Sequence, residues 1–290
     1  ISGAAADLNT VLTAGGITGL GAEAVTVTDS AVTAAVLNTL NGNTTGLVTA
    51  TGVTAITGTI AQINTLVGNE GDSGDKVNLD TDYTATITDT DIAASVLNTL
   101  NSNVPGLVTA TSVTNITGTA AAINTLMGNE GDSGNKINLD GDFTVTVDAG
   151  SVAAAHLNTI NAKTTGLVTA TAATTITGTA AAINTLIGNE GNSGDKVNLD
   201  SDFLVTIAAG SVSAAHLNTI NAATTGLVTA TAATALTGTA AQINTLVGNE
   251  GDSGDKVNLD TDYTATISDT SIAASVLNTL NSNVPGAINA

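Results

Sequence analysis

A repeat of 60 residues constrains the fold of this chain more than any other feature. Full copies occupy 47–106, 107–166, 167–226 and 227–286, and each opens on an apolar residue that begins a Thr-containing run. Residues 1–46 form a shortened copy, and 287–290 match the start of a truncated one. A fixed internal period is typical of chains that grow by stacking similar units, so we expect a single solenoid over 1–290.

Each 60-residue copy contains two related halves, and each half predicts a strand followed by a short helix. The segment Tyr83-Thr-Ala-Thr-Ile87 alternates in polarity, which is typical of a half-buried strand. In the apolar run that follows, Val96 and Leu100 fall on one helical face, with Asp89 or Thr90 as the expected N-cap. The first half of the copy has the same pattern.

A helix of about ten residues is marginally stable alone, so it needs tertiary packing. One strand–helix pair cannot bury its own apolar face, whereas stacked pairs can. We therefore predict an α/β fold: a right-handed repeat solenoid of stacked strand–short-helix coils, with a parallel β-sheet on one side. A mainly-β parallel β-helix is the alternative. The aromatic content is 1%, so the core must consist of Leu, Ile, Val and Ala.

Charge and composition exclude several classes of function. The formal net charge is −20, with five basic residues against 25 acidic ones. Binding of nucleic acid requires clusters of Lys and Arg, so it is excluded as a function, and cations are the natural partners. There is no cysteine and therefore neither a disulfide nor a thiolate site. No apolar run reaches the 18 or more residues that membrane insertion needs.

An acidic segment recurs once per full copy and contains most of the acidic residues. It occupies 68–82, 128–142, 188–202 and 248–262. Its carboxylates and amides are the hard oxygen ligands that calcium prefers, although the spacing differs from that of an EF-hand. We expect calcium as a cofactor here, and no organic cofactor; the alternative is a solvated, turn-rich loop whose lysine offsets part of the charge. The expected metal ligands are Asp72, Asp75, Asp80, Asp82, Asp132, Asp140, Asp142, Asp195, Asp200, Asp202, Asp252, Asp255, Asp260 and Asp262.

Threonine recurs on one face of the predicted strands. Stacked coils would present two columns of Thr, a pattern that resembles the face of solenoid ice-binding proteins. The alternatives are a face for lateral association and the ordinary preference of Thr for half-exposed strands. Leu204 interrupts one column. The expected binding face comprises Thr49, Thr51, Thr84, Thr86, Thr109, Thr111, Thr144, Thr146, Thr169, Thr171, Thr229, Thr231, Thr264 and Thr266.

An asparagine recurs once per coil in the motif Leu/Ile-Asn-Thr-Leu/Ile, for example at Asn38, Asn98, Asn158 and Asn218. Its side-chain amide is suited to a ladder between coils or to a bond with the backbone. A unique catalytic site should break the repeat, and nothing in the sequence does. We therefore expect that the protein is not an enzyme.

Two segments carry a resemblance to a known class of proteins. They are Ile176-Thr-Gly-Thr-Ala-Ala181 and Ser211-Val-Ser-Ala-Ala-His-Leu-Asn-Thr-Ile220, with their copies in the other repeats. They resemble the tandem-repeat regions of very large secreted surface proteins of bacteria, notably cyanobacteria. The resemblance covers nearly the whole chain and implies an extracellular or cell-surface location, a structural or adhesive role, and often calcium.

We therefore expect a structural subunit of an extracellular filament or surface layer that is stabilised by calcium and whose partner is itself, as a homopolymer. The chain begins within a repeat and stops where a new strand would start, so both ends of the stack would expose strand edges that template association. A head-to-tail contact that does not close gives a fibre. The alternative is an ice-binding or cell-adhesion segment of a giant secreted adhesin.

Overall fold

The computed structural model describes residues 1–290 as an α/β repeat solenoid, in which short helices alternate with short parallel strands. The fold class expected from the sequence is thus confirmed. The helices are α1 Ala5–Leu12, α2 Ala34–Gly42, α3 Ile60–Gly68, α4 Ala94–Asn103, α5 Ala120–Asn129, α6 Ala154–Asn161, α7 Ala180–Gly188, α8 Ala214–Ala223, α9 Ala240–Gly248 and α10 Ala274–Asn283.

The strands contain two to six residues each. They are β1 Ser2–Gly3, β2 Val25–Val27, β3 Ala31–Thr33, β4 Val48–Ala50, β5 Ala55–Gly58, β6 Val77–Leu79, β7 Thr84–Ile87, β8 Asp91–Ala93, β9 Val108–Ala110, β10 Asn115–Gly118, β11 Ile137–Leu139, β12 Thr144–Val147, β13 Gly150–Ala153, β14 Val168–Ala170, β15 Ala173–Gly178, β16 Val197–Leu199, β17 Leu204–Ile207, β18 Gly210–Ser213, β19 Val228–Ala230, β20 Ala233–Gly238, β21 Val257–Leu259, β22 Thr264–Ile267 and β23 Ile288–Asn289. Each full repeat therefore contributes two helices, as expected, but the first three contribute five strands each and the fourth contributes four.

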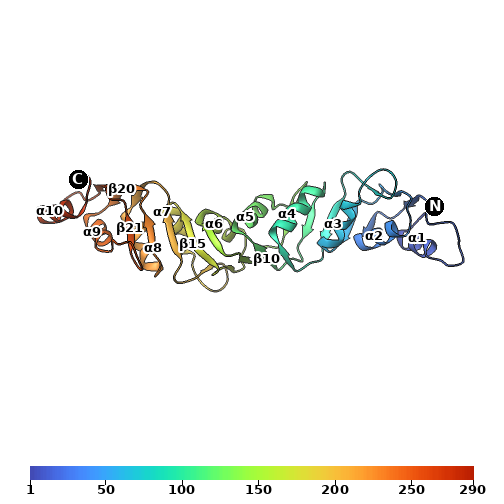
Figure 1. The fold of residues 1–290 in the computed structure, drawn as a ribbon, viewed down its shortest axis with the longest axis horizontal. Coiled ribbons are helices and arrows are strands. Elements are labelled where there is room, and N and C mark those ends of the chain that lie inside the picture. The colour runs from blue at the N-terminus through green and yellow to red at the C-terminus, as the bar shows by residue number, and fades with distance from the viewer. The chain divides into compact units, whose positions relative to one another are not determined.

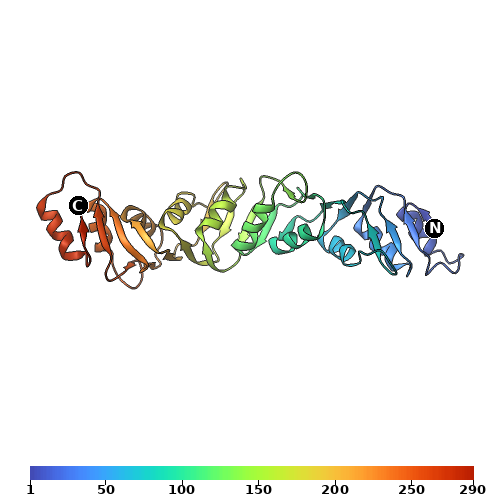
Figure 2. The same cartoon turned by 90° about the horizontal axis from the view of Figure 1, so that it is seen from above.

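The chain forms two compact units. The first comprises Ile1–Gly118 and Thr125–Phe143, and the second comprises Thr119–Asn124 and Thr144–Ala290. Within the first unit α1, α2, α3 and α4 follow one another, each packed on the next (Figure 1). Within the second unit α6 to α10 do the same, with the strands beside them (Figure 2). Both units are thus built by the same rule.

The strands pair in parallel, but they form several short sheets where the sequence predicted one. In the first unit the orders are β1-β2-β4-β6 and β3-β5-β7-β9-β11, with β8 beside β10. In the second unit they are β13-β15-β17-β19-β21 and β18-β20-β22-β23, with β12-β14-β16. The strands of one five-stranded sheet occupy five different positions within the 60-residue repeat. Each sheet therefore takes its strands from successive coils.

The acidic segment covers one edge of each sheet that ends in β6, β11, β16 or β21. Strand β6 pairs with β4 on one side. On the other side the loop folds back on it: Gly71 N–H donates to the Val77 carbonyl (3.1 Å), and Val77 N–H donates to the Asn69 carbonyl (3.0 Å). The loop therefore occupies the edge that a further strand would need, and covering an edge in this way prevents unwanted pairing.

The predicted alternation of the strands is confirmed at β7. Tyr83, Ala85 and Ile87 are buried, whereas Thr84 and Thr86 are exposed. Successive side chains of a strand point to opposite faces, so the apolar set faces the core. The helices complete that core with the residue directly before the recurrent Asn and the residue two positions after it: Leu37, Leu40, Ile63, Leu66, Leu97 and Leu100 are fully buried.

The first helix of the repeat begins at a threonine whose side chain caps it. Thr59 is the N-cap of α3, and Gln62 completes a capping box. Gln62 N–H donates to Thr59 Oγ1 (3.3 Å), and Thr59 N–H donates to Gln62 Oε1 (3.0 Å). Two backbone donors at the helix start are thereby satisfied.

The second helix departs from the prediction. It begins at Ala94, with Ala93 as a cap that makes no side-chain bond, and Val96 is 38% exposed. Asp89 lies too early to cap this helix. Its Oδ2 instead accepts the Ile60 N–H of α3, in the neighbouring coil, at 2.8 Å. The expected N-cap therefore acts between coils, a contact that sequence spacing alone does not reveal.

The recurrent asparagine also links neighbouring coils. Asn38 Nδ2 donates to the Gln62 carbonyl (2.9 Å), Asn158 to that of Ala182 (2.9 Å), and Asn218 to that of Gln242 (2.9 Å). The sequence predicted either a ladder of side chains or a bond to backbone. The bond to backbone is present, and its acceptor lies on the following helix.

Candidate functional site

The acidic loops are closed by backbone bonds and have a defined turn. In the first copy Gly74 has φ +66°, a left-handed conformation that suits glycine, and Lys76 N–H donates to the Gly74 carbonyl (2.9 Å). The stem of Lys76 lies against Gly71, where an added Cβ would be 3.0 Å from Lys76 Cγ. The stem of Lys76 thus packs on its own loop. This placement agrees with the alternative interpretation, in which the lysine offsets part of the negative charge of a solvated loop.

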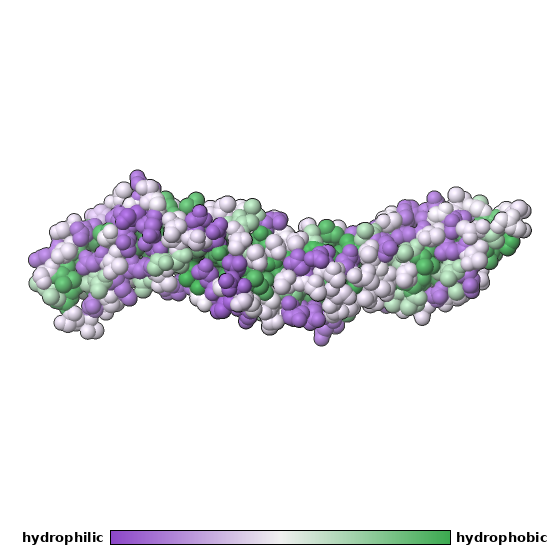
Figure 3. All heavy atoms as spheres, turned by 90° about the horizontal axis from the view of Figure 1, so that it is seen from below, coloured by the Kyte–Doolittle hydropathy of each residue, from purple (hydrophilic) through white to green (hydrophobic).

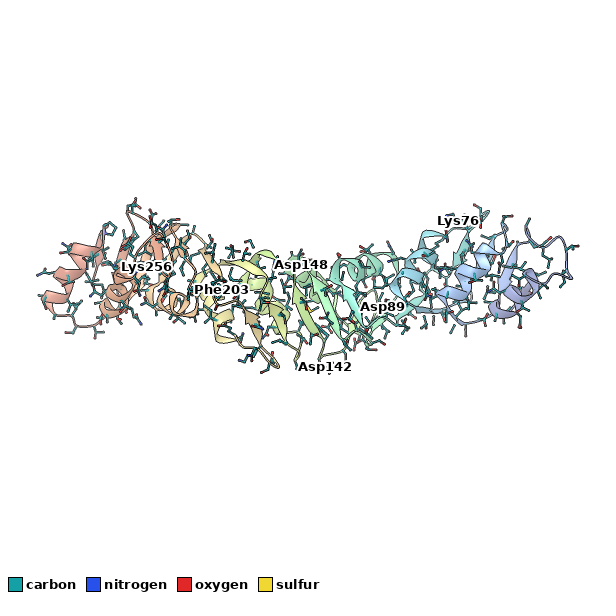
Figure 4. All side chains as sticks on the ribbon, turned by 60° about the horizontal axis from the view of Figure 1, so that its bottom comes forward. Lys76, Asp89, Asp142, Asp148, Phe203 and Lys256 are labelled. Atoms are coloured by element: carbon teal, nitrogen blue, oxygen red, sulfur yellow. The ribbon has the colours of Figure 1, made fainter.

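The carboxylates proposed as calcium ligands are spread along these loops. Asp72 and Asp75 are exposed near the turn, as are their counterparts in the other copies. Figure 4 shows Asp142 and Lys76 each at the margin of the ribbon. No group of three or more His, Asp or Glu side chains is placed to hold a metal ion.

One carboxylate per loop has a local structural task. Asp80 Oδ1 accepts the Thr81 N–H at 2.7 Å, Asp200 Oδ1 accepts the Ser201 N–H at 2.7 Å, and Asp260 does the same for Thr261. Such bonds shape tight turns, so these oxygens stabilise the backbone whether or not a cation is present.

The carboxyl group of Glu70, in the first acidic loop, lies near the phenol of Tyr83. Burial raises the pKa of the Glu70 carboxyl above its ordinary value. Burial also raises the pKa of Tyr83, and the nearby Glu70 carboxylate adds to the rise. In the fourth copy the pKa of Tyr263 is raised to about 12, mainly by burial and to a smaller extent by the nearby Glu250 carboxylate. The two hydroxyls are buried and have no hydrogen-bond partner.

The threonines form one column per sheet where two were expected. Thr57 lies beside Thr86, and Thr86 beside Thr109, in adjacent strands. The second column fails for two reasons: Thr84 lies beside Ala55, and Thr51 lies in the turn after β4. Thr111, Thr171 and Thr231 likewise follow their strands, whereas Thr144, Thr146, Thr264 and Thr266 are exposed in theirs and Thr49, Thr109, Thr169 and Thr229 are half-buried.

Two hollows lie in the second unit. The first, of about 260 Å³, adjoins the start of α7 and is lined by Thr179, Ala180, Ala209 and His216 among others. At the equivalent place in the fourth copy, Asp269 Oδ2 accepts the Ala240 N–H at 2.7 Å. Ala209 occupies the position of Asp269 in the third copy and has no carboxylate. The first hollow therefore lies at the start of α7, which lacks the bond from an aspartate of the neighbouring coil that the start of α9 has.

The second hollow, of about 450 Å³, lies between the end of α8 and the fourth acidic loop. Its polar lining comprises Ser201, Asn221, Thr224, Thr225, Asn249 and Asp255. Only Asp255 belongs to the predicted metal ligands. The sequence contained a signal for Asn221, because a second asparagine recurs three residues after the first at Asn41, Asn101, Asn161 and Asn221, and all four are buried.

The surface is mixed in polarity. Figure 3 shows apolar groups separated by polar and charged ones on the face in view. The exposed large apolar side chains are Ile1, Ile17, Val96 and Leu204. None of the helices has both the length and the apolar character that crossing a membrane would require.

Comparison with known proteins adds no family. No family model matches the chain, and neither a curated protein nor a solved structure matches it. The functional argument therefore rests on the geometry of the repeat.

Proposed function

We propose that this chain is a structural building block of an extracellular filament or surface layer, whose copies stack head to tail. The observation that carries the proposal is the repeated contact between coils. Strand β7 pairs with β9 through Ala85↔Val108 and Thr86↔Thr109, and β17 pairs with β19 through Val205↔Val228 and Thr206↔Thr229. The same register thus recurs 120 residues later.

A contact of this kind joins two different surfaces, one from each side of a coil. Such a heterologous contact generates an open polymer when it does not close into a ring. A coil of a second copy presents the same backbone groups as the next coil of the same chain, so it is chemically suited to continue the stack. Extracellular placement, calcium as the stabilising cation, and the absence of an enzymatic role belong to the same proposal.

The bonds that flank these strands suggest how one copy would join the next. Val48 N–H and Val228 N–H donate to the carbonyls of Lys76 and Lys256 in the adjoining coils, both at 2.9 Å. Ile288 occupies the equivalent position in β23, since it pairs with Ala265 of β22 as Val228 pairs with Val205. The equivalent lysine carbonyls are already bonded within their own chain, so in a polymer the Ile288 N–H would donate to a backbone carbonyl at the exposed strand edge of another copy.

Sedimentation velocity over a range of protein concentrations tests this proposal. The wild-type chain should form species larger than the monomer. Ile288→Pro removes the backbone donor and should shift the distribution to monomer, whereas Ile288→Ala keeps the donor and should assemble. Equal assembly by both variants would refute this joining surface, and a monomeric wild type at all concentrations would refute the polymer.

The alternative is an adhesive or ice-binding segment, for which the in-register column Thr57, Thr86 and Thr109 is the supporting observation. The loss of the second column removes the two-dimensional Thr array that ice binding would use. Thermal hysteresis of the purified chain distinguishes the two functions: a measurable value supports ice binding, and its absence leaves the structural role.

A further inference from the structure

The first hollow lies at a position where other coils of the same chain hold a carboxylate. The first backbone N–H of three helices, α1, α3 and α9, donates to an aspartate of the neighbouring coil. These bonds are Ala5 to Asp29 (2.7 Å), Ile60 to Asp89 (2.8 Å) and Ala240 to Asp269 (2.7 Å). The first hollow is lined by Ala180 and Ala209, the counterparts of Ala240 and Asp269. The repeat therefore builds a carboxylate-binding helix start, and α7 has it without the carboxylate.

The start of α7 keeps the donor that the other helix starts use. Thr179 is the N-cap, and its Oγ1 accepts the Ala182 N–H at 3.2 Å. The Ala180 N–H has no acceptor within the chain, although Ala180 is 5% exposed. A buried polar group without a partner costs about 1–3 kcal/mol, so this N–H favours an acceptor in the hollow.

A histidine accompanies the loss of the aspartate. Seven residues after Asp269 the chain has Val276, whereas seven residues after Ala209 it has His216. His216 lines the hollow, and an imidazole ring carries an N–H donor that valine lacks. The third copy has thus exchanged an acceptor for a donor. The second copy shows the same two exchanges, with Ala149 and His156.

The remaining lining suits an anion better than a cation. It contains no acidic side chain, and Ser211 and Ser213 add hydroxyl groups that can donate. The net charge of −20 opposes an anion, but exposed charges farther away than about 10 Å are largely screened at 0.1 M salt. A water molecule takes about 30 Å³ of liquid volume, so a hollow of about 260 Å³ has room for an anion of a few heavy atoms.

We propose that the first hollow binds the carboxylate group of a small molecule from solution. One carboxylate oxygen accepts the Ala180 N–H, as Asp269 Oδ2 accepts the Ala240 N–H, and His216 is the second donor. The bound molecule connects the start of α7 to the coil of α8, as Asp269 connects the later coils. A helix N-terminus favours negative charge, which adds to the attraction. The site goes beyond the proposed function and does not depend on it.

Hydrogen exchange of the full chain, followed by mass spectrometry, tests the site with acetate as the probe. Sodium chloride of equal ionic strength is the reference. Saturating acetate should slow exchange at the start of α7 roughly fivefold, the effect expected of a helix cap. It should leave the start of α9 unchanged, because Ala240 already has its carboxylate.

Three variants assign the effect to the hollow. Ala209→Asp should slow exchange at the start of α7 without acetate and remove the response to acetate. His216→Val should weaken the response and keep the fold, because valine occupies this position in the fourth copy. Ala241→Asp is the matched control: it adds the same charge at an exposed residue outside the hollow, so the response should remain.

Equal exchange at the start of α7 in acetate and in chloride would refute the site, and the hollow would then hold water only. Loss of the response in Ala241→Asp as well as in Ala209→Asp would also refute it, because the effect would follow net charge. If Ala209→Asp does not fold, His216→Val decides: an undiminished response overturns the proposal. Assembly is measured separately by sedimentation, so failure of this site and failure of the polymer are distinguishable.

Discussion

Replacement of Gly106 by alanine tests how closely successive coils approach. Gly106 N–H donates to the Tyr83 carbonyl at 3.1 Å, just before the strand β9 that pairs with β7. A Cβ at this position would lie 2.6 Å from the Tyr83 carbonyl oxygen and 2.9 Å from that of Asp82. Both distances are far shorter than an ordinary carbon–oxygen contact, and both neighbours are backbone, so the strand itself must move.

Movement of the strand breaks the hydrogen bond between Gly106 N–H and the Tyr83 carbonyl, which contributes about 0.5–1.5 kcal/mol, and strains the adjoining pairing of β7 with β9. Forced repacking of this kind costs typically about 1–3 kcal/mol more. We expect Gly106→Ala to lower stability by about 2–4 kcal/mol, which corresponds to a fall in Tm of roughly 5–15 °C. Circular dichroism melting measures the shift, and hydrogen exchange at the amides of β7 and β9 locates it.

Gly68→Ala is the matched control for this experiment. Gly68 is the last residue of α3, and an added Cβ there meets nothing within 4 Å. The same substitution should therefore leave stability unchanged or raise it by up to about 1 kcal/mol, because alanine favours the helix. Equal effects of the two substitutions would refute the inference that the coils touch through the Gly106 backbone.

Three further substitutions have expected outcomes. Ala209→Asp should raise stability by about 1 kcal/mol in thermal melts by supplying the missing carboxylate to the Ala180 N–H, and a destabilised variant would contradict the inter-coil cap. Tyr263→Phe should make the protein more resistant to alkaline unfolding: its folded pKa of about 12 lies above the ordinary value of 10.0, so the stability it contributes is present below pH 10 and lost as pH rises towards 12. Unchanged alkaline unfolding would contradict burial of the phenol. Glu250→Gln should stabilise at pH 7, because burial raises the pKa of this carboxyl and the ionised form opposes folding there; the gain should shrink as pH falls through the raised pKa and be lost below the ordinary value.

The sequence predicts those parts of the fold that depend on local pattern. Alternation over Tyr83–Ile87 identifies the buried and exposed faces of β7, and the apolar spacing in the first half of the repeat identifies the helix α3. Both depend on residues within one strand or one helical turn. The 60-residue period predicts the stacking, because a repeated strand–helix unit buries its apolar face only against its neighbours.

The sequence does not predict which groups meet between coils. Asp89 has the spacing of a local N-cap, yet it bonds to the start of α3, 29 residues earlier. The short strand β6, Val77–Leu79, contains too few residues for a period to be recognised, and its edge is covered by the loop that precedes it. Both features depend on distances across the stack, which no single stretch of sequence contains.

The sequence predicts only the part of the candidate site that lies within one acidic loop. Composition and turn residues locate the acidic loops, and Asp255 is among the residues they identify. Asn221 and Thr224 line the second hollow from a neighbouring coil, so their role depends on how coils stack.

Negative-stain electron microscopy of the purified chain, in millimolar calcium and again in a chelator, tests the central claim that this protein is a self-assembling structural unit. We expect filaments in the presence of calcium. Filaments in the chelator as well would show that assembly needs only the strand contacts, whereas filaments in calcium alone would make the cation part of assembly. Separate single particles in both conditions, at protein concentrations up to the solubility limit, would contradict the claim.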